Sequence, residues 1–100
     1  MIIAINENID AIKKLCSNYN VARLDVFGSV LTDKFNPNSD VDFLVSFNNI
    51  PIEDYADNYF GLQEALSNLL QREIDLVEAK AIRNKVFLNN IERNKVKIYG

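Results

Sequence analysis

The chain has 100 residues, 48% of them hydrophobic, which is enough to bury a core as a single domain over residues 1–100. Its 11 basic and 14 acidic residues give a net charge of −3, which argues against broad nucleic-acid binding. The absence of histidine excludes His-based catalysis and most zinc sites, and no apolar run approaches the ~20 residues of a membrane span.

The cysteine content indicates a cellular compartment. The only cysteine, Cys16, cannot form an internal disulfide, and it lies among apolar helix positions where a small core residue is expected. The N-terminus also lacks a signal-peptide pattern. These features favour a reducing, cytoplasmic location.

Hydrophobic periodicity predicts a helix followed by a strand in the first third of the chain. Residues 6–19 have Ile9, Ile12 and Cys16 at helical spacing. Residues 21–28 alternate between apolar and charged side chains, as expected for a strand with one buried face.

The clearest strand covers residues 40–47, where apolar side chains occupy every second position. Asp40 and Asp42 would share its opposite face. Residues 29–34 are predicted to form a short helical turn, and residues 36–39 a loop.

The second half of the chain continues the alternation. We expect an amphipathic helix over residues 53–71, a strand over 73–78 with Asp75 on its polar face, a helix over 81–93 and a short strand over 96–99. The predicted fold class is α/β (α+β), a small mixed β-sheet with helices packed on one face.

The most informative motif is Gly28-Ser29, followed after ten residues by Asp40-Val41-Asp42. A Gly-Ser turn can present backbone N–H groups to a phosphate. Two carboxylates on one strand face can hold Mg²⁺ against that phosphate. The combination suggests a phosphoryl- or nucleotidyl-transfer site.

The Cβ atoms of Asp40 and Asp42 would lie roughly 6–7 Å apart, at ~3.3 Å rise per residue, and their flexible carboxylates can converge on a shared metal pair. Asp75 can join them if its strand neighbours theirs, and a divalent cation would relieve the repulsion among three carboxylates. The alternative is an ordinary solvated strand face, since such faces often carry Asp and Glu.

The pattern of Gly-Ser, ten residues, Asp-x-Asp and a later strand Asp resembles the signature of the nucleotidyltransferase superfamily related to DNA polymerase beta. The resemblance runs from Ala11 to Gly100, and at this length the chain is similar to the minimal members, the MNT domain proteins. It implies the nucleotidyltransferase fold.

The resemblance also implies residue roles. Gly28 and Ser29 would hold the β- and γ-phosphates of ATP, the substrate. Asp40 and Asp42 would bind two Mg²⁺ ions. Asp75 would complete the second metal site and help deprotonate the acceptor hydroxyl.

Minimal members are commonly antitoxins paired with an all-helical HEPN-type ribonuclease toxin, so the resemblance implies a Mg²⁺-dependent transfer of AMP from ATP to a toxin tyrosine. Two alternatives stay open. The chain could be a non-catalytic antitoxin that blocks its toxin by occupancy, or it could transfer a nucleotide to a small molecule.

One segment departs from the family pattern. Family members usually follow Gly-Ser with Arg-Ala-Arg-Gly, whereas this chain has Val30-Leu31-Thr32-Asp33, and Lys34 is its first cation. The usual arginine offsets the charge of the triphosphate. Lys34 or Arg23 could substitute for it. The three aspartates favour an enzyme, and the missing arginine favours a binding module.

Overall fold

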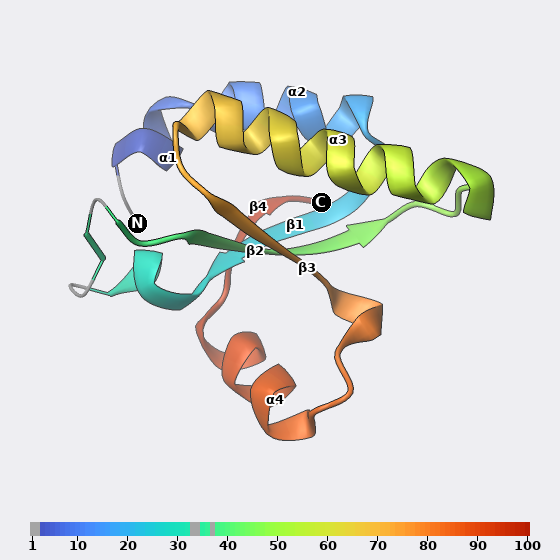
Figure 1. Cartoon of the computed structure of the whole chain (residues 1–100). Helices are drawn as coiled ribbons and strands as arrows, with labels where there is room; N and C mark the ends of the chain where they lie inside the picture. Colours follow the sequence, from blue (N-terminus) through green and yellow to red (C-terminus); the bar gives the residue numbers. More distant parts are fainter. Residues whose placement is uncertain (1–2, 33–34, 37) are drawn as a thin grey trace.

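The computed structural model describes residues 3–32, 35–36 and 38–100, and it forms a layered α/β structure (Figure 1). Its helices are α1 (Ile3–Glu7), α2 (Ile9–Asn18), α3 (Ile52–Leu70) and α4 (Lys85–Asn94). Its strands are β1 (Val21–Phe27), β2 (Val41–Phe47), β3 (Ile74–Glu78) and β4 (Val96–Tyr99). Short 3₁₀ helices, η1 (Gly28–Leu31) and η2 (Ala79–Ala81), follow β1 and β3. The predicted fold class is confirmed.

The four strands form one mixed sheet in the order β3-β2-β1-β4. β1 pairs antiparallel with β2 and β4, whereas β2 and β3 are parallel because α3 carries the chain back between them. In this register Asp42 lies opposite Phe27 on one side and Asp75 on the other. The pairing therefore places the second and third predicted aspartates side by side.

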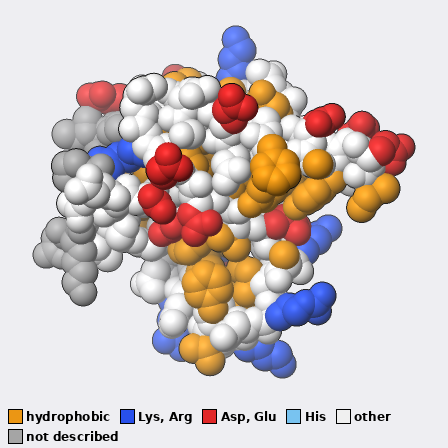
Figure 2. All heavy atoms as spheres, in the orientation of Figure 1, with side chains coloured by type: hydrophobic (Ala, Val, Ile, Leu, Met, Phe, Trp, Pro, Cys, Tyr) orange, Lys and Arg blue, Asp and Glu red, His pale blue; other side chains and the backbone are white. Residues whose placement is uncertain are grey.

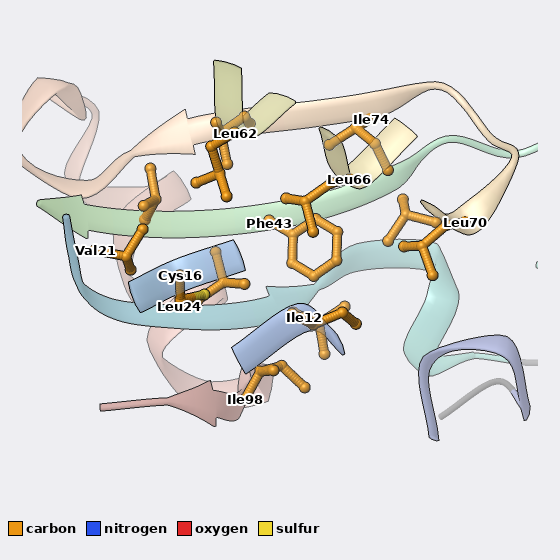
Figure 3. Packing of buried hydrophobic residues seen from close by; sticks show 14 of the residues in the cluster. Ile12, Cys16, Val21, Leu24, Phe43, Leu62, Leu66, Leu70, Ile74 and Ile98 are labelled. Carbon is orange, nitrogen blue, oxygen red and sulfur yellow. The ribbon is translucent and has the colours of Figure 1, made fainter. Parts of the chain in front are cut away.

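The main core lies between the sheet and helices α1, α2 and α3. Figure 3 shows Phe43 of β2 with Leu66 of α3 above it, Leu70 of α3 to its right and Ile12 of α2 below it, while Cys16 of α2 lies beside Leu24 of β1. Burial raises the pKa of the Cys16 thiol to about 12, so the thiol stays protonated as a small core group. Its place in the apolar core, predicted from its helical spacing, is confirmed.

The opposite face of the sheet carries α4, as Figure 1 shows. Ile91 of α4 packs with Phe27 of β1 and Leu44 of β2 in a second, smaller apolar cluster. The expectation that helices cover one face therefore describes α1, α2 and α3, while α4 partly covers the face on which the aspartates lie.

Two predicted helices have different boundaries in the structure. The helix expected over residues 6–19 is divided into α1 and α2 at Asn8. The helix expected over 81–93 begins only at Lys85, because the side-chain oxygen of Asn84 accepts hydrogen bonds from the backbone N–H groups of Val86 (2.9 Å) and Phe87 (3.1 Å).

The turn expected over residues 29–34 corresponds to η1. The last two residues of the expected turn, Asp33 and Lys34, lie outside the described residues. Pro37 of the predicted loop lies outside them too. No helix in the described part of the chain is long and apolar enough to cross a membrane.

Candidate active site

The Gly28-Ser29 turn begins where β1 ends, at the edge of the face that carries α4. Gly28 has a positive φ of 80°, which glycine adopts without strain. A Cβ atom at this position would lie 2.2 Å from Oδ2 of Asp42, so the glycine also makes room for that carboxylate. Val30, buried at 3% exposure, anchors the turn in the main core.

Asp42 and Asp75 are direct neighbours on β2 and β3. The pKa of Asp42 is raised from 3.8 to about 6, first by burial, then by repulsion from Asp75 and Asp40, and by a hydrogen bond between the carboxyl groups of Asp42 and Asp75. A cation between these two carboxyl groups would favour their ionised forms. Carboxylate oxygens are also the ligands that Mg²⁺ prefers, so this pair fits the metal.

β3, which carries Asp75, is held in place from α3. The Tyr59 hydroxyl donates to the carbonyl oxygen of Leu76, and the Gln63 amide donates to that of Ile74 at 3.3 Å. These carbonyl groups flank Asp75 in sequence. The bonds fix the backbone on both sides of an aspartate whose own side chain is exposed.

Asp40 is exposed and precedes the first residue of β2. It borders a hollow of about 450 Å³ together with Arg72 and Glu73, whereas Asp42 lines a different cleft. Across residues 3–32, 35–36 and 38–100, no three or more His, Cys, Asp or Glu side chains form a group that could hold a metal ion. The structure thus joins Asp42 with Asp75, and Asp40 is close enough to raise the pKa of Asp42.

Arg72 organises the loop that precedes Asp40. Its Nη1 donates to the carbonyl oxygens of Asn36 (3.0 Å) and Ser39 (3.2 Å), and its guanidinium lies 4.3 Å from the ring centre of Phe35. At the next residue after Asp40, the backbone N–H of Val41 donates a hydrogen bond to the carbonyl oxygen of Glu73 (3.1 Å). The turn between α3 and β3 therefore fixes the backbone on both sides of Asp40, just before β2 begins.

A cleft of about 770 Å³ opens beside Gly28 and Asp42 and runs along α4. The residues that line it are Phe27, Gly28, Leu31, Thr32, Asp42, Phe87, Asn90, Ile91, Asn94 and Val96. Figure 2 shows acidic side chains gathered over the middle of the molecule, where Figure 1 draws β2 and β3, with apolar side chains below them. The Asp42 carboxylate in this cleft would repel a bare phosphate, so an anionic ligand needs a bridging cation here.

Arg23 does not supply a free cation. Its guanidinium forms two hydrogen bonds with the carboxylate of Asp25, at 2.9 and 3.0 Å, and this pairing raises the pKa of Arg23. Asp25 is 1% exposed, so the arginine charge is used to balance a buried carboxylate. The suggestion that Arg23 replaces the usual family arginine is therefore wrong.

Comparisons with known proteins show the family of the chain. Residues 9–98 match the family model described as "Nucleotidyltransferase domain". The chain belongs to the nucleotidyltransferase domain family. The predicted resemblance and the predicted class of enzyme, a nucleotidyltransferase, are thereby confirmed.

Two relatives carry more specific names. The chain is 34% identical over 96 residues to "Putative protein adenylyltransferase MJ0128" of Methanocaldococcus jannaschii, which covers 92% of this chain and 95% of that protein. It is 32% identical over 74 residues to "Protein adenylyltransferase MntA" of Thermococcus cleftensis, covering 74% of this chain and 72% of that protein.

Solved structures share the fold. One described as "Structure of putative minimal nucleotidyltransferase" aligns with a TM-score of 0.77 and 25% identity over 92% of this chain and 90% of the other. "Crystal structure of the toxin-antitoxin with AMP-PNP" aligns with a TM-score of 0.72 and 21% identity over 93% of this chain and 73% of the other. A structure described as a tri-AMPylated Shewanella oneidensis HEPN toxin in complex with MNT antitoxin aligns with a TM-score of 0.66 and 18% identity over 95% of this chain and 71% of the other.

Two features of the site were not found from sequence. Nothing in the sequence distinguishes Arg72 from a surface cation, because its partners are backbone carbonyl groups. The side of the cleft formed by α4 could have been suspected from the sequence, because the apolar residues after position 81 are only roughly periodic. That irregularity reflects apolar side chains such as Phe87, which is 44% exposed in the cleft rather than buried in the core.

Proposed function

We propose that this nucleotidyltransferase moves AMP from ATP to a hydroxyl group of a protein partner, in a Mg²⁺-dependent reaction. The partner proposed is an all-helical HEPN-type toxin and the acceptor a tyrosine. The observation that carries the proposal is the pairing of Asp42 and Asp75 beside the Gly28 turn. The names and complexes of the similar proteins support it.

The different exposure of the two paired aspartates suggests a division of roles. Asp42 is half-buried and lines the cleft, so it faces the nucleotide. Asp75 is exposed on the edge strand β3, where a bulky protein acceptor can approach. Asp40 precedes β2 and would join Asp42 in holding metal, while Gly28 and Ser29 would receive the β- and γ-phosphates.

The reaction follows from that division. The acceptor oxygen attacks the α-phosphorus of ATP, the bond from this phosphorus to the β-phosphate oxygen breaks, and pyrophosphate leaves. The hydroxyl proton passes to a carboxylate oxygen of Asp75. Two Mg²⁺ ions held by Asp40, Asp42 and Asp75 would offset phosphate charge and lower the pKa of the acceptor hydroxyl when bound.

The cytoplasm is the proposed location, in keeping with the free buried thiol of Cys16. A second candidate function, a non-catalytic antitoxin, is favoured by one observation. The described residues that line the cleft include no basic side chain to offset triphosphate charge.

The test is intact-mass spectrometry of the helical partner after incubation with this protein, ATP and either Mg²⁺ or Mn²⁺. We expect added AMP units, strongly reduced transfer by Asp75→Asn with ATP binding largely kept, and unchanged transfer by the control Glu73→Gln, another exposed carboxylate beside β3. Neutralised toxicity with no adduct would refute the enzyme and favour the non-catalytic antitoxin.

A further inference from the structure

The wall of the cleft formed by α4 has an aromatic side chain that the core does not require. The ring of Phe87 meets Phe27 edge to face, with centroids 6.3 Å apart, yet Phe87 remains 44% exposed. Leu31 and Ile91 line the same cleft. An exposed aromatic ring beside apolar side chains is suited to stacking against a flat ring of a ligand.

Polar groups continue along the same helix face. Asn90 and Asn94 follow Phe87 at i+3 and i+7, so all three side chains lie toward the cleft that they line. The Nδ2 of Asn94 donates to the backbone carbonyl oxygen of Asn90 at 3.0 Å, which orients the side-chain amide of Asn94. The Asn90 amide offers both a hydrogen-bond donor and an acceptor at the cleft.

We propose that this part of the cleft is the base site of the nucleotide, with Phe87 stacked on the base and Asn90 bonded to its polar edge. The inference rests on the proposed function, which puts the triphosphate at Gly28 and Asp42. Because the cleft runs from those two residues to α4, the other end of the nucleotide meets the α4 wall. Its volume of about 770 Å³ lies in the usual range for small-molecule sites.

The chemistry of this wall favours a purine. The Asn90 amide can bond both the amino group and the neighbouring ring nitrogen of adenine, and cytosine presents the same pair of groups, so the choice between the two bases depends on stacking against Phe87. Purines have the larger ring face for stacking. ATP is therefore the expected ligand over CTP.

Calorimetric titration with ATP, CTP and inorganic tripolyphosphate, each with Mg²⁺, tests the inference. Phe87→Ala should weaken ATP binding about tenfold, the loss expected for one stacking side chain. Tripolyphosphate, which has no base, should bind as in wild type. Phe87→Leu, which keeps apolar packing on Phe27, should show the same selective loss, and Phe87→Trp should retain ATP binding. Asn90→Ala should weaken the binding of ATP and of CTP by a similar factor and leave the binding of tripolyphosphate unchanged.

The matched control is Val86→Ala, since Val86 is 71% exposed on the same helix and does not line the cleft. Unchanged ATP binding in both Phe87→Ala and Phe87→Leu would overturn the base site, as would an equal loss of ATP and tripolyphosphate. Wild-type protein that binds tripolyphosphate as tightly as ATP would overturn the base site alone. Wild-type protein that binds neither ligand would overturn the proposed function together with it.

Discussion

The two faces of the sheet differ in what they do with the same strands. On the face under α1, α2 and α3, β2 contributes the wholly buried apolar residues Val41, Phe43 and Val45. On the face under α4 the same strand contributes Asp42 and Leu44, one half-buried and charged, the other apolar. The first face stabilises the fold, and the second gives up part of its apolar contact to hold carboxyl groups near water.

Two aspartates on the α4 face sharpen the contrast. Asp25 is fully buried and paired with Arg23, so its charge is balanced within the protein. Asp42 is surrounded by Asp75 and Asp40, and its pKa rises to about 6. A carboxyl group kept among others beside a cleft is expected of a binding site, whereas the paired group has a structural role.

The largest expected effect is on the face under the three helices. Phe43→Ala removes a fully buried ring and should lower the free energy of unfolding by about 4 kcal/mol. Leu44→Ala, one residue along on the α4 face, should lower it by about 2 kcal/mol because its cluster is smaller. Chemical denaturation measures both. An equal or larger loss for Leu44→Ala would contradict the contrast between the faces.

Gly28→Ala should come next. Alanine at a φ of 80° is strained, and its Cβ would overlap the carboxylate of Asp42, for a loss of about 2 kcal/mol. Because the clash displaces Asp42, binding of Mg²⁺ and ATP should be lost as well. Gly28→Ala combined with Asp42→Ala removes the carboxylate that the new Cβ would meet, so the stability loss that remains measures the strain of the positive φ alone. Full retention of ATP binding by Gly28→Ala would show that the turn does not position Asp42.

Arg72→Ala should lower the free energy of unfolding by about 1–2 kcal/mol through lost bonds to loop carbonyl groups. If those bonds position Asp40, the Mg²⁺ concentration needed for half-maximal stabilisation by ATP should also rise, with partial rescue in Arg72→Lys. Arg83→Ala is the control, because Arg83 is exposed whereas Arg72 is half-buried. If Arg72→Ala lowers stability but leaves the Mg²⁺ concentration for half-maximal stabilisation by ATP unchanged, Arg72 stabilises the loop without positioning Asp40.

The smallest effect is a pH dependence. The pKa of Asp42 is higher in the folded chain, about 6, than its ordinary value of 3.8, so the folded state binds more protons between these values. Asp42 therefore contributes stability below pH 3.8 that is lost as the pH rises through 6. The free energy of unfolding of wild type, relative to that of Asp42→Asn, should fall by about 1 kcal/mol over this range after solvent screening. A difference that is constant with pH would contradict the raised pKa.

How far the sequence predicted this molecule depended on whether a signal was local. Alternation along β2 placed Asp42 and Phe43 on opposite faces, and the register of β2 with β3 then brought Asp42 to Asp75. The position of α4 was not predicted, because an irregular apolar pattern does not say which face a helix covers. Arg72 was missed since its partners are backbone groups far away in sequence.

The most direct test of the account compares the melting temperatures of wild type and Asp42→Asn at pH 7, with and without Mg²⁺ and ATP. Without ligand the variant should melt several degrees higher, because removing a half-buried, repelled charge gains about 1 kcal/mol after solvent screening. With ligand only wild type should be stabilised, so the order reverses. Glu73→Gln should behave as wild type. An equal ligand shift in wild type and Asp42→Asn would contradict a nucleotide site at this carboxylate.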